Sequence, residues 1–220
     1  MIPVIAIDGP SASGKGTVAE RVAQSLGFHF LDSGALYRLV ALAAGRSGIS
    51  MGDTTALEKL AANLDVRFYQ GNIYLNNQLV TDDIRSEICS RHASLAAAIP
   101  GVRTALLTRQ RAFREAPGLV ADGRDMGSVV FPDAVLKVFL TADPKIRAHR
   151  RYNQLMNKGI PASMQSLLWD IEERDTRDES RTVAPLKRGN ALLLDTTTLT
   201  IQQAVDQVLA WFAEAQPGLS

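Results

Sequence analysis

The sequence has few of the features that mark secreted or membrane proteins. Its 220 residues contain a single cysteine, Cys89, so no disulfide can form within the chain. No apolar run approaches the ~20 residues that a helix needs to cross a bilayer. No charged segment followed by an apolar segment precedes Val4, as a secretion signal would require. We therefore expect a cytoplasmic protein without a membrane partner.

Excess charge of one sign and metal-binding spacings are also missing. The 24 basic and 23 acidic residues give a formal net charge of +1, so nucleic acid is not an expected partner. The three histidines, His29, His92 and His149, lie far apart in the sequence and match no metal-ligand spacing. The length and the 46% apolar content suit one substantial core, and we expect a single-domain monomer.

A glycine-rich segment follows a short apolar run near the N-terminus. Residues 9–17 stand between Val4-Ile-Ala-Ile-Asp8 and a stretch with helical periodicity. In such a turn successive backbone N–H groups converge on one anion, and a lysine adds a cation for the β- and γ-phosphates. This setting favours a triphosphate site over an ordinary glycine-rich turn. The predicted ATP-binding residues are Gly9, Pro10, Ser11, Ala12, Ser13, Gly14, Lys15, Gly16 and Thr17.

The residue after Lys15 departs from the general phosphate-loop pattern. That pattern places there a serine or threonine whose hydroxyl binds Mg²⁺. Here Gly16 occupies the position, and the hydroxyl comes one residue later, at Thr17. The loop therefore offers no expected inner-sphere ligand, which leaves Mg²⁺ to be held indirectly.

Apolar runs and helical periodicities alternate along the chain. The runs predict five strands, at residues 4–8, 28–31, 119–122, 135–140 and 191–194. Helical spacing predicts helices over 17–26, 35–44, 55–64 and from Thr200 onward. Capping boxes are predicted at Thr55 with Glu58 and at Thr200 with Gln203. This order predicts an α/β fold of the P-loop NTPase type, with a doubly wound five-stranded parallel sheet.

Residues 65–83 break the α/β pattern. Short extended runs are separated there by the turn sequences Gln70-Gly71-Asn72 and Asn76-Asn77. They predict a small antiparallel β insert, which either decorates the surface or folds over a second substrate. Helical sequence resumes over 83–115, with an interruption at Pro100-Gly101.

Polar residues follow the second and third predicted strands, where open α/β sheets bind ligands. Residues 32–34 are Asp-Ser-Gly, and residues 122–125 are Asp-Gly-Arg-Asp. Beside a triphosphate site, the second cluster indicates a Mg²⁺-orienting carboxylate at Asp122 and an anion clamp at Arg124. The alternative is a strand-end turn with a solvated salt bridge.

Two later segments carry arginines at helical spacing. Arg147, Arg150 and Arg151 fall on one helix face, where a transferring phosphoryl group would compensate their repulsion. A basic surface face is the alternative. Arg174, Arg177, Asp178 and Arg181 also share a face, but an exposed salt-bridge ladder explains their alternating signs equally well.

These motifs together resemble those of bacterial cytidylate kinases. The resemblance rests on Ile7 to Thr17, Leu31 to Arg38, Ala121 to Pro132 and Glu173 to Arg181, and it covers almost the whole chain. The Asp-Gly-Arg-Asp-Met-Gly block is more specific than the phosphate loop, which adenylate kinases share. The resemblance implies transfer of the γ-phosphate of ATP to CMP or dCMP with Mg²⁺, giving CDP or dCDP, in pyrimidine nucleotide metabolism.

The resemblance also implies a role for each motif residue. The catalytic groups would be Lys15, Arg147, Arg151 and Asp122, with Asp122 and the phosphates holding Mg²⁺. The CMP-binding residues would be Ser33, Arg38 and Arg124 at the phosphate, Ser94, Arg103 and Asp125 at the cytosine, Arg174 and Asp178 at the ribose, and Arg181 beside them. A carboxylate suits the base because it accepts from the exocyclic amine of cytosine, where uracil presents a carbonyl.

The resemblance finally implies three parts within one domain of residues 1–220. They are a core (about 1–64, 116–143 and 186–220), a monophosphate-binding insert (about 65–115) and an arginine-rich helical lid over ATP (about 144–185). Two alternatives stay open. Another P-loop nucleotide or small-metabolite kinase would lack the cytosine-reading set, and a non-catalytic ATP-binding regulator would bind ATP without turnover.

Overall fold

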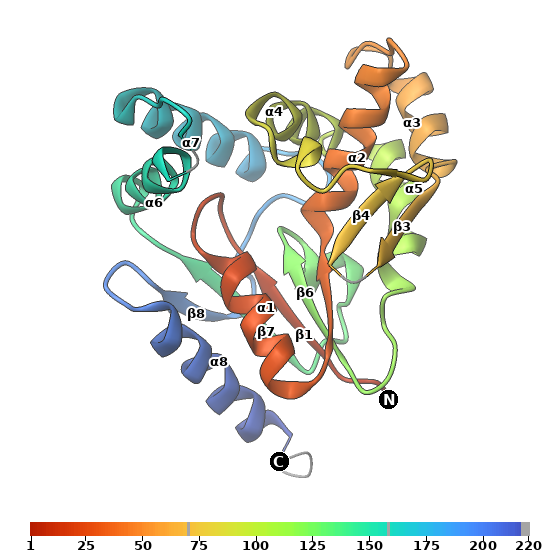
Figure 1. Cartoon of the computed structure of the whole chain (residues 1–220). Coiled ribbons are helices and arrows are strands. Elements are labelled where there is room, and N and C mark those ends of the chain that lie inside the picture. Colours follow the sequence, from red (N-terminus) through yellow and green to blue (C-terminus); the bar gives the residue numbers. More distant parts are fainter. Residues whose placement is uncertain (70, 158, 217–220) are drawn as a thin grey trace. The chain divides into compact units, whose positions relative to one another are not determined.

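The computed structural model describes residues 1–69, 71–157 and 159–216 (Figure 1). The chain divides into two compact units, residues 1–31 with 113–220 (the first unit) and residues 32–112 (the second unit). Gln70 of the predicted turn and residues 217–220 of the predicted core lie outside the described residues. The predicted division into core, insert and lid is a functional one and stays a prediction.

The first unit is built on a five-stranded sheet in the order β2, β6, β1, β7, β8. The strands are β1 (Val4–Asp8), β2 (His29–Asp32), β6 (Leu119–Gly123), β7 (Leu136–Thr141) and β8 (Leu192–Asp195). The pairs β1–β6, β1–β7 and β7–β8 are parallel. Every residue of β1 and β6 is buried, as their continuous apolar runs predict for inner strands. The predicted α/β fold is confirmed.

Helices α1 (Lys15–Leu26) and α8 (Ile201–Ala215) cover one face of this sheet (Figure 1). Their apolar side chains, among them Val22 and Val208, pack against Ile7 and Val138 of the strands. Burying such side chains contributes about 1.5–3 kcal/mol each, which anchors the helix that follows the phosphate loop. The apolar core therefore packs against the helix that begins at the phosphate loop.

The ends of these two helices follow from their capping residues. Gly27 ends α1 in the left-handed conformation, with φ 65°, as the sequence predicts. The capping box of Thr200 and Gln203 at the start of α8 is confirmed. The start of α1 at Lys15 comes two residues before the predicted one.

Two further helices of the first unit lie side by side, α6 (Pro144–Met156) and α7 (Met164–Glu179) (Figure 1). They form the predicted helical segment between β7 and β8. A π-helical turn, Met126–Val130, follows β6 after Arg124 and Asp125. Among the described helices, none is long and apolar enough to cross a membrane.

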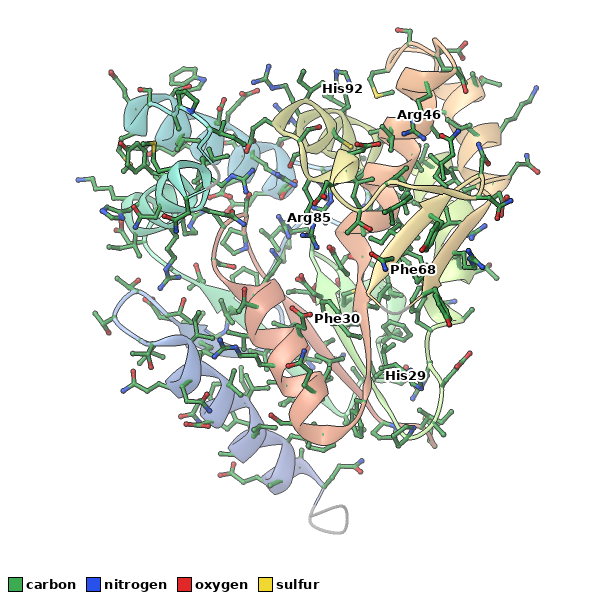
Figure 2. The ribbon with its side chains drawn as sticks, viewed as in Figure 1. His29, Phe30, Arg46, Phe68, Arg85 and His92 are labelled. Atoms are coloured by element: carbon green, nitrogen blue, oxygen red, sulfur yellow. The ribbon has the colours of Figure 1, made fainter. Side chains whose placement is uncertain are left out.

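In its described residues, the second unit combines four α-helices and the short 3₁₀-helix Asp83–Arg85 with the predicted antiparallel insert. The helices are α2 (Ser33–Arg46), α3 (Thr54–Ala62), α4 (Glu87–Ala96) and α5 (Pro100–Arg111). The insert consists of β3 (Val66–Tyr69), β4 (Asn72–Leu75) and β5 (Gln78–Leu79), paired antiparallel. Arg46 of α2 (Figure 2) donates to Gln78 Oε1 at 3.1 Å and pairs with Asp83 Oδ2 at 2.8 Å. These contacts join the insert to α2.

The capping box predicted at Thr55 and Glu58 is wrong. Asp53 caps α3, because its carboxylate accepts the backbone N–H of Ala56 at 3.0 Å. Glu58 lies instead against α5, where a Cβ on Gly101 would stand 2.0 Å from its carboxyl carbon. Packing against α5 therefore determines the position of Glu58, the side chain that the sequence pattern assigns to the cap.

Candidate active site

The phosphate loop joins β1 to α1 and has a backbone that only small residues allow. Gly9 has φ 155°, and a Cβ there would stand 2.0 Å from the carbonyl oxygen of Leu140. Gly14 has φ 92° and directly precedes α1. The positive end of the α1 dipole therefore opens onto the loop, an arrangement that suits a phosphate group.

Two predicted catalytic residues meet at this loop. Lys15 Nζ donates to the carbonyl oxygen of Pro10 at 3.2 Å and stands 3.9 Å from Asp122 Oδ1. Both side chains are only 10% exposed. Because Lys15 opens α1 and Asp122 is the residue before the last one of β6, the helix and the strand bring a cation and a carboxylate to one place.

The glycine after Lys15 has a steric reason. A Cβ on Gly16 would stand 3.1 Å from Asp122 Oδ2, so a serine or threonine would crowd that carboxylate. An oxygen of Asp122 thus lies beside the position from which the usual hydroxyl binds Mg²⁺. Carboxylate oxygen is a ligand that Mg²⁺ accepts, commonly with waters and phosphates as its other ligands. Among the described residues, no cluster of three or more His, Cys, Asp or Glu residues could hold the ion without a nucleotide.

Arg147 reaches the loop from α6. Its Nε donates to the carbonyl oxygen of Ala142 at 2.9 Å, and its Nη1 donates to that of Ser11 at 3.1 Å. Its Nη2 pairs with Asp175 Oδ2 of α7 at 2.6 Å. Arg147 is only 3% exposed, so its guanidinium is fixed beside the phosphate loop. The structure thus places this predicted catalytic residue at the loop.

A second arginine of α6 lies at the loop, one that the sequence analysis placed on the arginine face but left out of the catalytic groups. Arg150 Nη1 donates to the carbonyl oxygen of Ser13 at 2.9 Å, and Nη2 donates to that of Thr196 at 2.6 Å. Arg151, which was predicted to be catalytic, donates to Gln154 Oε1 on its own helix at 2.6 Å. The i, i+3 spacing to Arg147 was the available signal for Arg150.

Asp178 joins two of the predicted CMP-binding arginines. Arg124 Nε donates to Asp178 Oδ2 at 2.9 Å, and Arg181 Nη2 pairs with the other carboxylate oxygen. Burial alone would raise the pKa of Asp178, but the charges of Arg124, Arg181 and Arg174 bring it below its usual range. Asp178 is 1% exposed. The three residues therefore form a buried ionised cluster.

The exposed-ladder interpretation fits only part of the α7 pattern. Arg177 pairs with Glu173 at the surface of the helix, as a ladder predicts. Asp178 and Arg181, in contrast, have side chains only 1% and 5% exposed. Arg174, on the same helix, contributes its charge to the buried cluster.

Asp8, which the sequence analysis did not single out, anchors the turn after β6. Its Oδ1 and Oδ2 accept the backbone N–H groups of Met126 and Gly127, each at 2.8 Å. Burial raises the pKa of Asp8 to about 7, although these two hydrogen bonds oppose the shift. Asp125, the predicted cytosine reader, directly precedes the anchored turn and is 3% exposed.

The second unit carries the remaining predicted CMP-binding residues. Ser33 opens α2 and is buried, and Arg38 follows on the same helix. Arg38 Nη2 pairs with Asp32 Oδ2 at 2.5 Å, while its Nε is buried without a hydrogen-bond partner in the described part of the chain. Asp32 also caps α2, so one carboxylate both starts the helix and orients this arginine.

The two other residues of this set come from α4 and α5. Ser94 and Arg103 are 3% and 9% exposed. Arg103 Nη1 donates to the carbonyl oxygen of Ala97 at 3.0 Å, and its guanidinium carbon lies 5.8 Å from the centre of the Tyr37 ring. The cation is thus held by a carbonyl dipole and an aromatic face.

Comparison with known proteins identifies the family. The cytidylate kinase family model matches residues 5–214. Cytidylate kinases of Cupriavidus necator and Chromobacterium violaceum are 57% and 58% identical to this chain, cover 99% and 98% of it, and are themselves covered to 98% and 97%. An uncharacterized protein from Eubacterium ventriosum shares the fold, with TM-score 0.55, 11% identity and coverage of 97% of this chain and 99% of that one. The chain therefore belongs to the cytidylate kinase family.

Proposed function

We propose that the protein transfers the γ-phosphate of ATP to CMP or dCMP, giving CDP or dCDP, in pyrimidine nucleotide metabolism. The observation that carries the proposal is the pairing of two sites at adjacent strand ends in the first unit. One is the phosphate loop with Lys15, Asp122 and Arg147. The other is the buried cluster of Arg124 and Asp178. Membership of the family points to CMP as the acceptor.

The donor triphosphate would bind at the phosphate loop. Lys15 and the N-terminus of α1 supply positive charge from one side, and Arg147 and Arg150 supply it from α6. These groups are already in place, so little reorganisation is needed when negative charge shifts during transfer. Residues 9–17 hold the donor in this proposal.

Mg²⁺ would be held by the nucleotide phosphates and oriented by Asp122. The distance of 3.1 Å between Asp122 Oδ2 and the place of a Cβ on Gly16 supports the assignment, because the carboxylate would then replace the missing hydroxyl as an oxygen near Lys15. When bound, the ion neutralises charge on the transferred phosphate.

The acceptor nucleotide would be bound by residues of several elements. We assign its phosphate to Ser33, Arg38 and Arg124, its base to Ser94, Arg103 and Asp125, and its ribose to Arg174 and Asp178, with Arg181 beside them. The burial of Asp178 supports this assignment, because a buried carboxylate holds its arginine partners in fixed positions away from solvent. A carboxylate at Asp125 would accept from the cytosine amine.

Catalysis would consist of positioning and charge neutralisation. The acceptor phosphate is itself an anionic nucleophile near neutral pH, so no strong general base is required. The chain's part is to hold two polyanions in line and to exclude water, which several arginines and a buried lysine can do.

A coupled assay of ADP release with a panel of monophosphates tests the function. CMP and dCMP should give turnover with ATP and Mg²⁺, and UMP and AMP should give far less. Turnover with another monophosphate alone would favour a different kinase. ATP binding without any turnover would favour a regulator. The cytoplasmic location and the monomeric state stay predictions, and light scattering tests the latter.

A further inference from the structure

Helix α7 presents two carboxylates, Asp175 and Asp178, three residues apart on one face. Asp178 holds Arg124, which follows β6. Asp175 holds Arg147, which comes from α6. The proposed function gives roles to both arginines and to Asp178, but none to Asp175.

The contact of Asp175 with Arg147 is close and sheltered. Oδ2 of the aspartate lies 2.6 Å from Nη2 of the arginine, and the two side chains are 16% and 4% exposed. The other nitrogens of this guanidinium donate to the carbonyl oxygens of Ala142 and Ser11. Asp175 is thus the one carboxylate among these three acceptors, and charged hydrogen bonds are roughly twice as strong as neutral ones.

The second oxygen of Asp175 has a different environment. Oδ1 is buried and accepts no hydrogen bond within the described part of the chain. A buried oxygen without a partner costs stability, so its retention calls for another explanation. The charge of Asp175 also acts on Arg124, whose pKa burial would lower but which Asp178, Asp122 and Asp175 together raise. The carboxylate therefore influences an arginine on the donor side and another on the acceptor side.

We propose that Asp175 is a positioning residue for phosphoryl transfer, whose charge fixes the guanidinium of Arg147 against the phosphate loop. The inference rests on the proposed function, because Arg147 acts only if a phosphoryl group is transferred. Without the charge, two neutral acceptors alone hold Arg147, and its guanidinium is less firmly fixed at the loop. The loss then falls on the reaction step rather than on nucleotide binding.

A matched pair of variants isolates the charge. Asp175→Glu and Asp175→Gln have side chains of nearly equal size, so any packing defect affects both. We expect the glutamine variant to lose at least tenfold in kcat and the glutamate variant to keep at least a third of it, with KM for ATP and CMP within about threefold. Asp170→Asn is the control, because Asp170 is an exposed aspartate of the same helix. Equal kcat for the Glu and Gln variants would overturn the inference.

A double-mutant cycle then tests whether the effect passes through Arg147. Arg147→Ala alone should lower kcat, and adding Asp175→Gln should lower it by less than threefold more. Independent, multiplicative losses would overturn the inference. Failure of the proposed function would give a different result, because the unaltered protein would then not phosphorylate CMP. Added guanidinium ion should partly restore Arg147→Ala but not the double variant, and equal rescue of both would also count against the inference.

Discussion

Asp8 accepts the backbone N–H of Met126 at 2.8 Å, and this bond ties the strand that enters the phosphate loop to the turn after β6. The second oxygen of Asp8 accepts the N–H of Gly127 at the same distance. Arg124 and Asp125 directly precede this turn. Within the first unit, one carboxylate therefore anchors both the donor loop and residues that we assign to the acceptor.

Asp8→Asn is expected to weaken both functions of that anchor. An amide presents one acceptor and one N–H₂ group, so one of the two backbone donors loses its partner. A buried unsatisfied donor costs about 1–3 kcal/mol, and urea unfolding should show a loss of this size at pH 8. Steady-state kinetics should show a rise in KM for CMP. A variant with unchanged stability and unchanged KM would remove Asp8 from the account.

The pH dependence of stability should also change in Asp8→Asn. Burial raises the pKa of Asp8 from 3.8 to about 7, so the folded state keeps a proton that the unfolded state releases between these values. The contribution of Asp8 to the free energy of unfolding therefore falls as pH rises through this window. Between pH 5 and 7, the free energy of unfolding of the wild type should therefore fall by roughly 2 kcal/mol relative to that of the variant. A constant difference would contradict the raised pKa.

Gly16→Ser is expected to lower activity although it restores the usual hydroxyl of phosphate loops. The new Cβ would stand 3.1 Å from Asp122 Oδ2 and would push this carboxylate away from Lys15. We expect kcat to fall at least tenfold, because the loss of one preorganised group costs on the order of 10²–10³-fold in kcat. Gly45→Ser is the control, because Gly45 is helical and a Cβ there meets no atom within 4 Å. Wild-type kcat in Gly16→Ser would refute the steric explanation.

Asp125→Asn is expected to erode the discrimination between CMP and UMP. The amide can donate to the uracil carbonyl, whereas the carboxylate can only accept. The ratio of kcat/KM for CMP over UMP should fall at least tenfold, mainly through loss with CMP. An unchanged ratio would exclude Asp125 from base recognition.

Asp178→Asn should impair phosphorylation of both CMP and dCMP, because Asp178 holds Arg124 and Arg181. A further loss with CMP alone is expected if the carboxylate also bonds the 2′-hydroxyl. The measurement is kcat/KM for the two acceptors, with Arg177→Gln as a surface control on the same helix. Equal losses for CMP and dCMP would leave Asp178 with a purely structural role.

The sequence predicts elements where local pattern and burial agree. The continuous apolar runs of β1 and β6 predict inner strands, and Gly27 predicts the end of α1. The capping box at Thr55 fails because Glu58 is drawn into contact with α5. Such a contact joins residues that are distant in the sequence, so no local pattern reveals it.

In the candidate site, too, local sequence patterns locate the motifs, but they do not show which side chains pack together. The motifs locate the phosphate loop and the arginine helix, but helical spacing puts Arg147, Arg150 and Arg151 on one face alike. Packing against the loop distinguishes Arg150 from Arg151. Asp8 and Asp175 lie within the matched segments, but no pattern gives either of them a role, since their importance lies in burial and in their hydrogen-bond partners.

The identity of the acceptor is tested by kcat/KM for CMP, dCMP, UMP and AMP with ATP and Mg²⁺. We expect CMP and dCMP to be phosphorylated at least tenfold more efficiently than UMP and AMP. Preference for UMP or AMP, or ATP binding without ADP release for any of the four, would contradict it.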